Sequence, residues 1–170
     1  MSSSNTALDL SVRKALLYLT KYNRNINLKE EQQKAIYELL RGKDVLAVLP
    51  TGFGKSMIFT VFGLAKSFGR DSEFINSEES TVVVISPLKS LISDQLAELE
   101  SIDCSATELS GETLQQIVEN PPCFVYATAE QALEDRFLKA VKDPKGKLHQ
   151  KISLIVVDES HTVETWSGKR

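Results

Sequence analysis

The sequence predicts an α/β fold in which a central, mainly parallel sheet is flanked by helices. Short apolar runs alternate along the chain with longer stretches of helical periodicity, and this alternation is typical of βα units. The apolar runs are rich in Val and Ile, as expected of strands that helices cover on both faces. The predicted strands span residues 45–49, 81–85, 106–109, 123–126 and 152–157.

Apolar residues at helical spacing predict that an N-terminal helix over 8–21 precedes the sheet and follows a flexible tail at 1–7. A second helix is expected over 29–40, with Gly42 as its stop signal. No shift in composition marks an internal boundary, so residues 8–170 are expected to form one domain. The remaining predicted helices are 55–66, 88–100, 112–118 and 130–142, and polar surface loops are expected at 69–80 and 143–150.

Composition places the chain among ordinary globular proteins, with 42% hydrophobic and 25% charged residues. The net charge is −3, which argues against the basic footprint of a protein that coats duplex DNA. No apolar stretch is long enough for a membrane span, so an intracellular protein is expected. Cys104 and Cys123 have no metal-binding spacing and are predicted to be reduced packing residues.

A phosphate-binding loop is predicted where the first strand meets the third helix. Gly52 and Gly54 allow the backbone to bring its amides close to phosphate oxygens at the helix N-terminus. Lys55 would reach the β and γ phosphates of ATP, and the Ser56 hydroxyl would ligate Mg²⁺. The alternative is a Gly-rich turn with an exposed lysine; a GTPase is disfavoured because no NKxD guanine motif occurs. The whole predicted loop is Pro50-Thr51-Gly52-Phe53-Gly54-Lys55-Ser56.

Two carboxylates follow the last predicted strand, Asp158 and Glu159, and His161 comes two residues later. The carboxyl end of a parallel strand is where open α/β sheets bind ligands. Asp158 would hold the Mg²⁺ shell, while Glu159 would polarise the water that attacks the γ phosphate. His161 could couple the nucleotide to bound nucleic acid. Alone, each of these residues has an ordinary structural alternative, and the phosphate loop is what makes the functional interpretation specific.

The segment from Val84 to Gln95 (VISPLKSLISDQ) resembles the strand-to-helix segment of RecQ-type DExH-box DNA helicases of superfamily 2. Pro87 cannot donate a hydrogen bond to a sheet, and Ser86 and Ser90 offer hydroxyls, so a helix start that faces a phosphate backbone is expected. The alternative is an ordinary βα turn. The candidate nucleic-acid contacts of this segment are Ser86, Pro87, Leu88, Lys89 and Ser90.

The resemblance continues on both sides of this segment. Lys29 and Gln32 stand where the family has its adenine-reading F-R-x-x-Q motif, and Gln32 would read the adenine edge by paired hydrogen bonds. Thr128 falls in a second nucleic-acid turn, in which Ala129 replaces the usual proline. Trp166 matches the family's aromatic-rich loop and would stack on a DNA strand; the alternative is a core or rim residue.

The resemblance implies a RecA-like P-loop NTPase domain, the first motor lobe of an ATP-dependent 3′–5′ DNA helicase in DNA repair or recombination. Implied partners are ATP, Mg²⁺, single-stranded or partly duplex DNA, and a second RecA-like lobe in cis or in trans, since this lobe is expected to be truncated at its C-terminal end and inactive alone. Such a protein would be nuclear in a eukaryote. The main alternative is a non-hydrolysing, nucleotide-dependent regulatory fragment. A transporter ATPase, suggested by Leu109-Ser110-Gly111, is disfavoured because the motif fails at Glu112.

Overall fold

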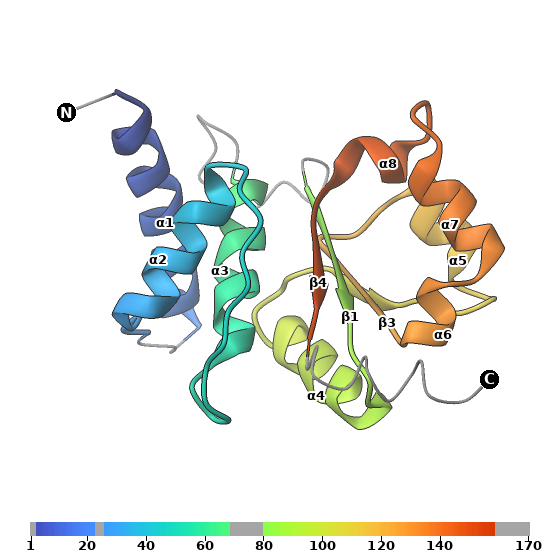
Figure 1. The fold of residues 1–170 in the computed structure, drawn as a ribbon, viewed down its shortest axis with the longest axis horizontal. Helices are drawn as coiled ribbons and strands as arrows, with labels where there is room; N and C mark the ends of the chain where they lie inside the picture. Colours follow the sequence, from blue (N-terminus) through green and yellow to red (C-terminus); the bar gives the residue numbers. More distant parts are fainter. Residues whose placement is uncertain (1–2, 23–25, 69–79, 159–170) are drawn as a thin grey trace. The chain divides into compact units, whose positions relative to one another are not determined.

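The computed structural model describes residues 3–22, 26–68 and 80–158 of the 170-residue chain. These residues fall into two compact units, 1–79 and 80–170, which are described separately (Figure 1). The first unit is helical in its described part, and the second holds the sheet. The boundary lies next to the polar insertion that the sequence predicts as a surface loop.

The described part of the first unit contains three helices, with α1 and α2 packed on α3 (Figure 1). α3 is apolar around most of its circumference, and its buried residues include Phe59, Phe62 and Leu64. α1 contributes Leu19 to the core and α2 contributes Ile36. α1 begins within the segment predicted as a tail, whereas Gly42 follows α2 as expected. The bounds are α1 (Ser3–Lys21), α2 (Glu30–Leu40) and α3 (Lys55–Ser67).

The prediction of a strand at 45–49 is wrong, because the structure assigns no strand to this segment. Leu46 and Val48 are 82% and 86% exposed. A strand requires a neighbouring strand to pair its backbone groups, and the described part of the first unit contains only helices. The apolar composition that predicts a strand is therefore present without the hydrogen-bonding partner that would form one.

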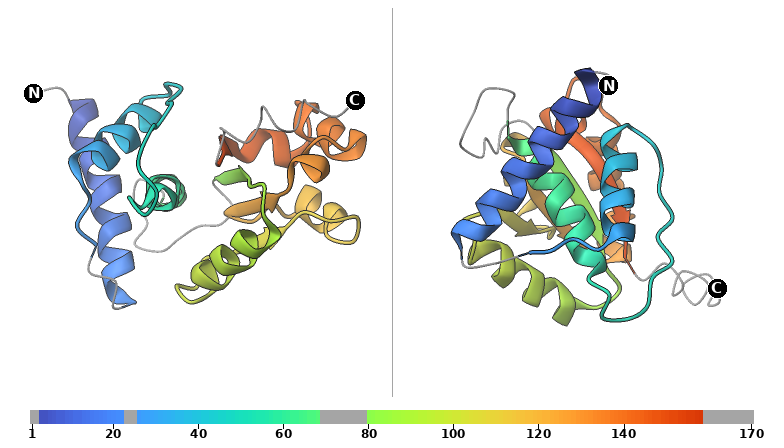
Figure 2. Two further views of the ribbon diagram at one scale, coloured as in Figure 1. Left: turned by 60° about the horizontal axis from the view of Figure 1, so that its bottom comes forward. Right: turned by 90° about the vertical axis from the view of Figure 1, so that its left-hand side faces the viewer.

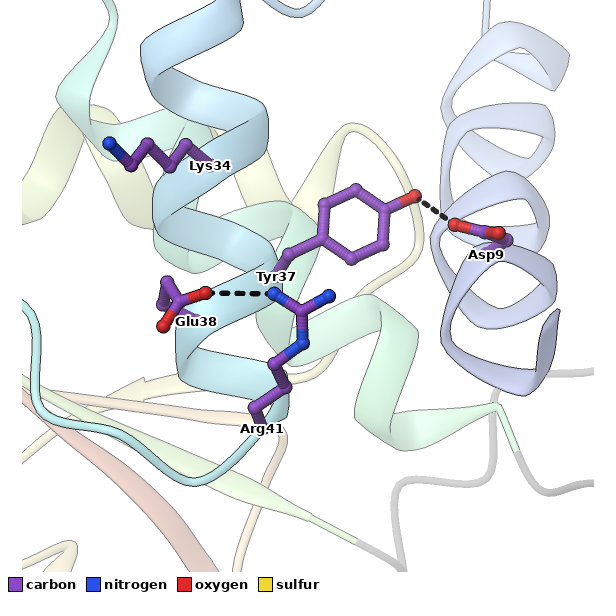
Figure 3. A pocket seen from close by; sticks show the side chains of 5 residues that line it. All are labelled: Asp9, Lys34, Tyr37, Glu38 and Arg41. Carbon is purple, nitrogen blue, oxygen red and sulfur yellow. Dashed lines mark hydrogen bonds and ion pairs between the residues drawn. The ribbon is translucent and has the colours of Figure 1, made fainter. Parts of the chain in front are cut away.

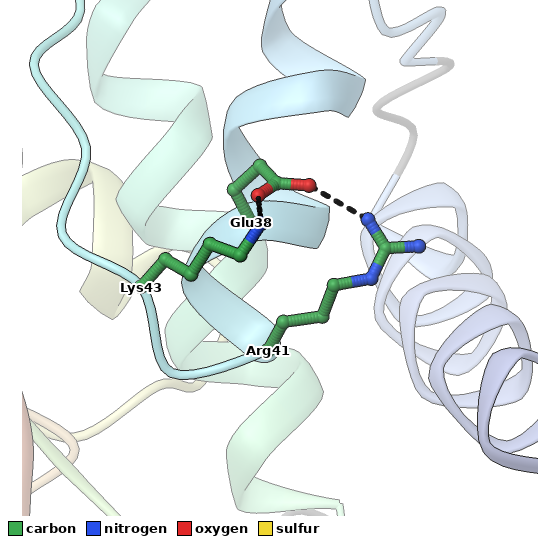
Figure 4. A network of polar contacts seen from close by, with 3 residues as sticks. All are labelled: Glu38, Arg41 and Lys43. Atoms are coloured by element: carbon green, nitrogen blue, oxygen red, sulfur yellow. Dashed lines mark hydrogen bonds and ion pairs between the residues drawn. The ribbon is translucent and has the colours of Figure 1, made fainter.

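Polar side chains join α1 to α2 at the surface of the first unit. The Tyr37 hydroxyl donates to Asp9 Oδ1 at 2.7 Å, beside a pocket of about 330 Å³ that Lys34, Glu38 and Arg41 also line (Figure 3). Glu38 pairs with both Arg41 and Lys43 (Figure 4). These two cations lower the pKa of Glu38 through hydrogen bonds, first from Lys43 and then from Arg41. The exposed ion pairs hold the end of α2 against the segment that follows it.

The second unit contains a sheet of four strands in the order β2-β3-β1-β4, and every adjacent pair is parallel. This arrangement confirms the predicted α/β class with a parallel sheet. The four predicted strands of this region are all present, within one residue at each end. Their bounds are β1 (Thr81–Ile85), β2 (Ala106–Glu108), β3 (Phe124–Ala127) and β4 (Ile152–Val157).

The helices of the second unit differ from the prediction at two places. The predicted helix over 130–142 is two helices, because Glu134 is extended (φ −62°, ψ 133°). A short helix also forms inside the predicted loop at 143–150, with Leu148 fully buried on it. The spacing of apolar residues does not reveal the break at Glu134, because a single extended residue leaves that spacing almost unchanged. The short helix has no apolar periodicity, because Leu148 is its one apolar residue. The bounds are α4 (Lys89–Glu100), α5 (Leu114–Glu119), α6 (Ala129–Ala132), α7 (Asp135–Lys142) and α8 (Lys147–Lys151).

A cluster of buried apolar side chains joins one face of the sheet to α5–α8. Val83 and Val125 face this cluster, which also contains Ile117, Phe137 and Leu148. Figure 1 shows these helices gathered on one side of the sheet, and Figure 2 shows α4 apart from them. Because side chains alternate along a strand, the neighbouring residues of β1 and β3 point to the opposite face.

Cys104 and Cys123 are free and buried, as predicted. A hydrogen bond to Cys123, together with burial, raises the pKa of the Cys104 thiol. Protonated thiols of this kind are suited to packing rather than to nucleophilic chemistry. Within the described residues, no helix has the length and apolar character to cross a membrane.

We expect the contact between Tyr37 and Asp9 to make stability sensitive to alkaline pH. Burial, the hydrogen bond to Asp9 and the negative charge of Asp9 raise the pKa of Tyr37 from 10.0 to about 12. A raised pKa means that the folded chain keeps this proton where the unfolded chain loses it. The stabilisation is therefore fully present below pH 10 and is lost as the pH rises from 10 to about 12.

The measurement is urea unfolding at several pH values for the wild type, Tyr37→Phe and Asp9→Asn. Tyr37→Phe should lose less of its free energy of unfolding between pH 10 and 12 than the wild type does. Asp9→Asn should be intermediate, because burial still acts on Tyr37. If the free energy of unfolding falls by the same amount between pH 10 and 12 in all three proteins, the contact between Tyr37 and Asp9 does not contribute to the pH dependence.

Candidate nucleotide and nucleic-acid site

The predicted phosphate loop forms a tight turn directly before α3. The Phe53 amide donates to the Pro50 carbonyl oxygen at 3.2 Å, which closes the turn. Gly52 and Gly54 have φ of 77° and 86°, a backbone conformation that favours glycine. α3 begins at Lys55, so Lys55 and Ser56 lie in its first turn and are both half-buried. The glycine turn therefore leads directly into a helix N-terminus, as in a phosphate-binding loop, but no strand precedes it in the described part of the first unit.

The Gln32 side chain holds this loop from α2. Its Nε2 donates to the carbonyl oxygens of Phe53 at 3.2 Å and Gly54 at 2.9 Å. Its Oε1 accepts from the Lys29 amide at 2.8 Å, and the residue is 5% exposed. The amide that the sequence assigns to adenine recognition thus binds the phosphate loop itself, with both N–H donors in use.

Lys29 makes a second contact with the same loop. Its Nζ lies 3.9 Å from the centroid of the Phe53 ring and 3.4 Å from the Phe53 carbonyl oxygen. The structure therefore brings Lys29 and Gln32 into contact with the loop. These are the residues that the sequence predicts to bind the nucleotide. The contact with the Phe53 ring is absent from the sequence prediction. The pairing of a basic residue with an aromatic residue in a glycine-rich loop could have suggested it.

Three predicted site residues meet at the carboxyl edge of the sheet. Ile85 of β1 is in register with Ala127 of β3 and with Val157 of β4. The residues that follow these three are Ser86, Thr128 and Asp158. The Ser86 amide donates to Ala127 O and the Asp158 amide to Ile85 O, each at 2.9 Å. Parallel register thus gathers residues that are far apart in the sequence.

These residues differ in what they expose. Ser86 is buried, and its hydroxyl oxygen has no hydrogen-bond partner among the described residues. The Thr128 hydroxyl caps α6 by accepting from the Gln131 amide at 3.3 Å. The Ser86 hydroxyl is buried and Thr128 is 7% exposed, whereas Asp158 is half-buried. Burial is the largest cause of the raised pKa of Tyr126, followed by the charges of Glu98, Cys104 and Asp158. Asp158 is therefore near enough to Tyr126 to contribute to this shift.

The N-terminus of α4 lies beside this edge, after Pro87. Leu88, Lys89 and Ser90 are exposed there, and no side chain caps the helix. The first turn contains no acidic residue. Its free amides and positive dipole end are therefore available to an anion.

Glu159, His161 and Trp166 lie outside the described residues. Lys55 and Ser56 belong to the first unit and Asp158 to the second. No group of three or more His, Cys, Asp or Glu in the described part of the chain could hold a metal ion. Ser56 has a hydroxyl oxygen and Asp158 has carboxylate oxygens, and Mg²⁺ binds oxygen ligands of both types.

A glycine-rich turn at a helix start and a carboxylate after a parallel strand are two features that P-loop nucleotide-binding proteins share. The profile of the DEAD/DEAH box helicase family matches residues 29–170. The chain belongs to this family, and its relatives include RecQ-type DNA helicases.

Three relatives illustrate the similarity. The ATP-dependent helicase wrn-1 of Caenorhabditis elegans is 28% identical over 91% of the chain. The ATP-dependent DNA helicase Q-like 5 of Arabidopsis thaliana is 30% identical over 83%, and the ATP-dependent DNA helicase RecQ of Haemophilus influenzae is 26% identical over 82%. The chain spans 14%, 14% and 21% of the lengths of these relatives.

We expect the two glycines of the loop to differ in their tolerance of a side chain. A Cβ at Gly54 would lie 2.9 Å from Gln32 Nε2, whereas one at Gly52 would meet no atom within 4 Å. Both substitutions by alanine strain the backbone by about 1–2 kcal/mol. Gly54→Ala should also disturb the Gln32 hydrogen bonds and therefore cost roughly 1 kcal/mol more than Gly52→Ala.

Urea unfolding of the two variants measures this difference. Gly52→Ala is the matched control, because it carries the backbone strain without the clash. Equal destabilisation of the two variants would show that Gln32 does not hold the loop as described.

Proposed function

We propose that this chain is the ATP-binding first motor lobe of a RecQ-like 3′–5′ DNA helicase that acts in DNA repair or recombination. The observation that carries the proposal is the glycine turn at the start of α3, with Lys55 and Ser56 in the first helical turn. The RecQ-type segment at the end of β1 and the family membership support it. The other proposed nucleotide contacts are Lys29, Gln32 and the loop residues before Lys55.

The proposed chemistry assigns one role to each polar side chain of the nucleotide site. The Lys55 ammonium opposes the negative charge of the β and γ phosphates of ATP. The Ser56 hydroxyl and the Asp158 carboxylate supply oxygen ligands to Mg²⁺, which neutralises phosphate charge when bound. Glu159 orients the attacking water and accepts its proton, and His161 couples this site to nucleic acid.

The proposed nucleic-acid contacts lie at the carboxyl edge of the second unit. The exposed first turn of α4 offers its amides, the Lys89 ammonium and the Ser90 hydroxyl to a phosphate of single-stranded DNA. Ser86 and Thr128 are buried and act by shaping this edge, with their hydroxyls reaching DNA only after a local rearrangement. Trp166 would stack on a base. A net charge of −3 fits a protein that grips a strand through a few local contacts.

Strand separation is proposed to require a second RecA-like lobe, in cis or in trans. The chain spans only 14% to 21% of the three relatives named above, so the activity of a whole helicase belongs to a longer assembly. A lobe of this kind can supply an arginine to the transferring phosphate. The alternative function is a regulatory module that binds nucleotide without hydrolysis. A helicase of this class would act inside the cell, and in the nucleus of a eukaryote.

We expect Lys55→Ala to abolish measurable binding of Mg-ATP. The substitution removes the main positive side chain that opposes the phosphate charge in a partly dry site. Isothermal titration calorimetry on the 170-residue chain provides the measurement. Lys66→Ala is the matched control, because Lys66 is an exposed lysine at the far end of the same helix. Unchanged affinity in Lys55→Ala would remove the phosphate-loop assignment.

We expect the 170-residue chain to bind Mg-ATP but to show no DNA-stimulated hydrolysis. An arginine finger from a second lobe is worth roughly 10³ to 10⁵ in rate, so hydrolysis should stay near background. The test is steady-state phosphate release with and without single-stranded DNA. Strong stimulation by DNA would contradict the need for another lobe, unless gel filtration shows a dimer that supplies it.

A further inference from the structure

We propose that Lys29 and Phe53 form a cation–π latch that holds the phosphate loop in its closed turn and that bound phosphate must displace. The proposal rests on the assignment of residues 50–56 as the ATP site. It adds a regulatory contact to that site and predicts that the contact opposes nucleotide binding. The latch is defined as the Lys29 ammonium, the Phe53 ring and the Phe53 carbonyl oxygen.

The contacts of the loop support the latch. The Phe53 amide donates to Pro50 O at 3.2 Å, so this amide serves the turn. A phosphate-binding loop works by directing its amides to phosphate oxygens. The loop must therefore give up this turn before the Phe53 amide can bind phosphate.

Lys29 opposes that rearrangement through two contacts with Phe53. Its Nζ lies 3.9 Å from the centre of the Phe53 ring and 3.4 Å from the Phe53 carbonyl oxygen. Rotation of the Phe53 backbone moves the ring and the carbonyl together, so both contacts break in one step. Gln32 strengthens the closed turn through the carbonyls of Phe53 and Gly54.

The latch can be removed without touching the buried part of the fold. Lys29 is exposed and Phe53 is half-buried, whereas Gln32 is buried and supports the start of α2. Lys29→Met keeps the apolar stem and removes the charge. Phe53→Leu keeps an apolar side chain and removes the aromatic face. Both variants leave the Gln32 hydrogen bonds in place.

A double-mutant cycle on the 170-residue chain tests the latch through ligand affinity. The probes are Mg-ATP and inorganic tripolyphosphate, which carries the phosphates without a base. Phe53→Leu should tighten binding of both probes by about two- to fivefold, the equivalent of one exposed cation–π contact. In the Lys29→Met background the same substitution should change affinity by less than about 1.5-fold.

Comparing the effect of Phe53→Leu on affinity in the wild type and in Lys29→Met separates the latch from other roles of Lys29. Any direct contact between Lys29 and nucleotide is absent from both Lys29→Met proteins and so cancels in the comparison. Weaker or unchanged binding by Phe53→Leu would overturn the proposal. An equal gain in both backgrounds would also overturn it, because the ring would then act without Lys29.

Hydrogen exchange tests the same latch without any ligand, so it remains informative if the ATP assignment fails. Amides in the peptide that covers residues 50–54 should exchange about two- to fivefold faster in Lys29→Met than in the wild type. Lys34→Met is the matched control, since Lys34 is an exposed lysine of α2 that lines the separate pocket beside Tyr37. Exchange rates equal to those of the wild type would overturn the latch. Unchanged nucleotide affinity in Lys55→Ala would overturn the ATP site instead.

Discussion

The hydrogen bonds from Gln32 to the phosphate loop are the interaction on which the candidate nucleotide site depends. A glycine-rich loop can adopt many backbone conformations. Gly52 and Gly54, which both have positive φ, add to this conformational freedom. The Gln32 amide reduces it by joining two loop carbonyls to the first turn of α2. Because Gln32 is buried, these hydrogen bonds are protected from competition with water, and losing them would leave polar groups unsatisfied.

The same hydrogen bonds bear on the role in adenine recognition that the family resemblance predicts for Gln32. The family resemblance assigns this side chain to the adenine edge, yet both of its N–H donors are used by the loop. An amide has only two such donors, so adenine and the loop would compete for them. The adenine role proposed for Gln32 would therefore couple recognition of the base to the conformation of the phosphate loop, with Lys29 and Phe53 as a weaker contact beside it.

In the second unit, strand β1 positions the candidate site residues, because it pairs with both β3 and β4. Its register aligns Ile85 with Ala127 and Val157, and so places Ser86, Thr128 and Asp158 along one edge. The exposed first turn of α4 follows directly from β1. One strand thus connects the proposed nucleic-acid contacts to the proposed metal ligand, through the turn from β1 into α4 and the hydrogen bond from the Asp158 amide to Ile85 O.

The amino-acid sequence by itself determined the strands β1, β3 and β4, because Val and Ile runs such as 81–85 and 152–157 indicate a covered parallel strand. It also predicted the glycine turn before α3, since Gly52 and Gly54 before Lys55 are a local pattern, and the phosphate-binding role of this turn is a proposal. Glu159, His161 and Trp166 remain predictions from motif alone.

Only the tertiary structure decided the features that depend on partners distant in the chain. Residues 45–49 have the composition of a strand but form none in the described unit, because a strand is defined by its hydrogen-bonded neighbour. Ser86 matches a nucleic-acid motif, yet packing buries its hydroxyl. The contact between Lys29 and Phe53 spans 24 residues. Local patterns specify which residues can interact, whereas burial and pairing depend on what the folded chain brings beside them.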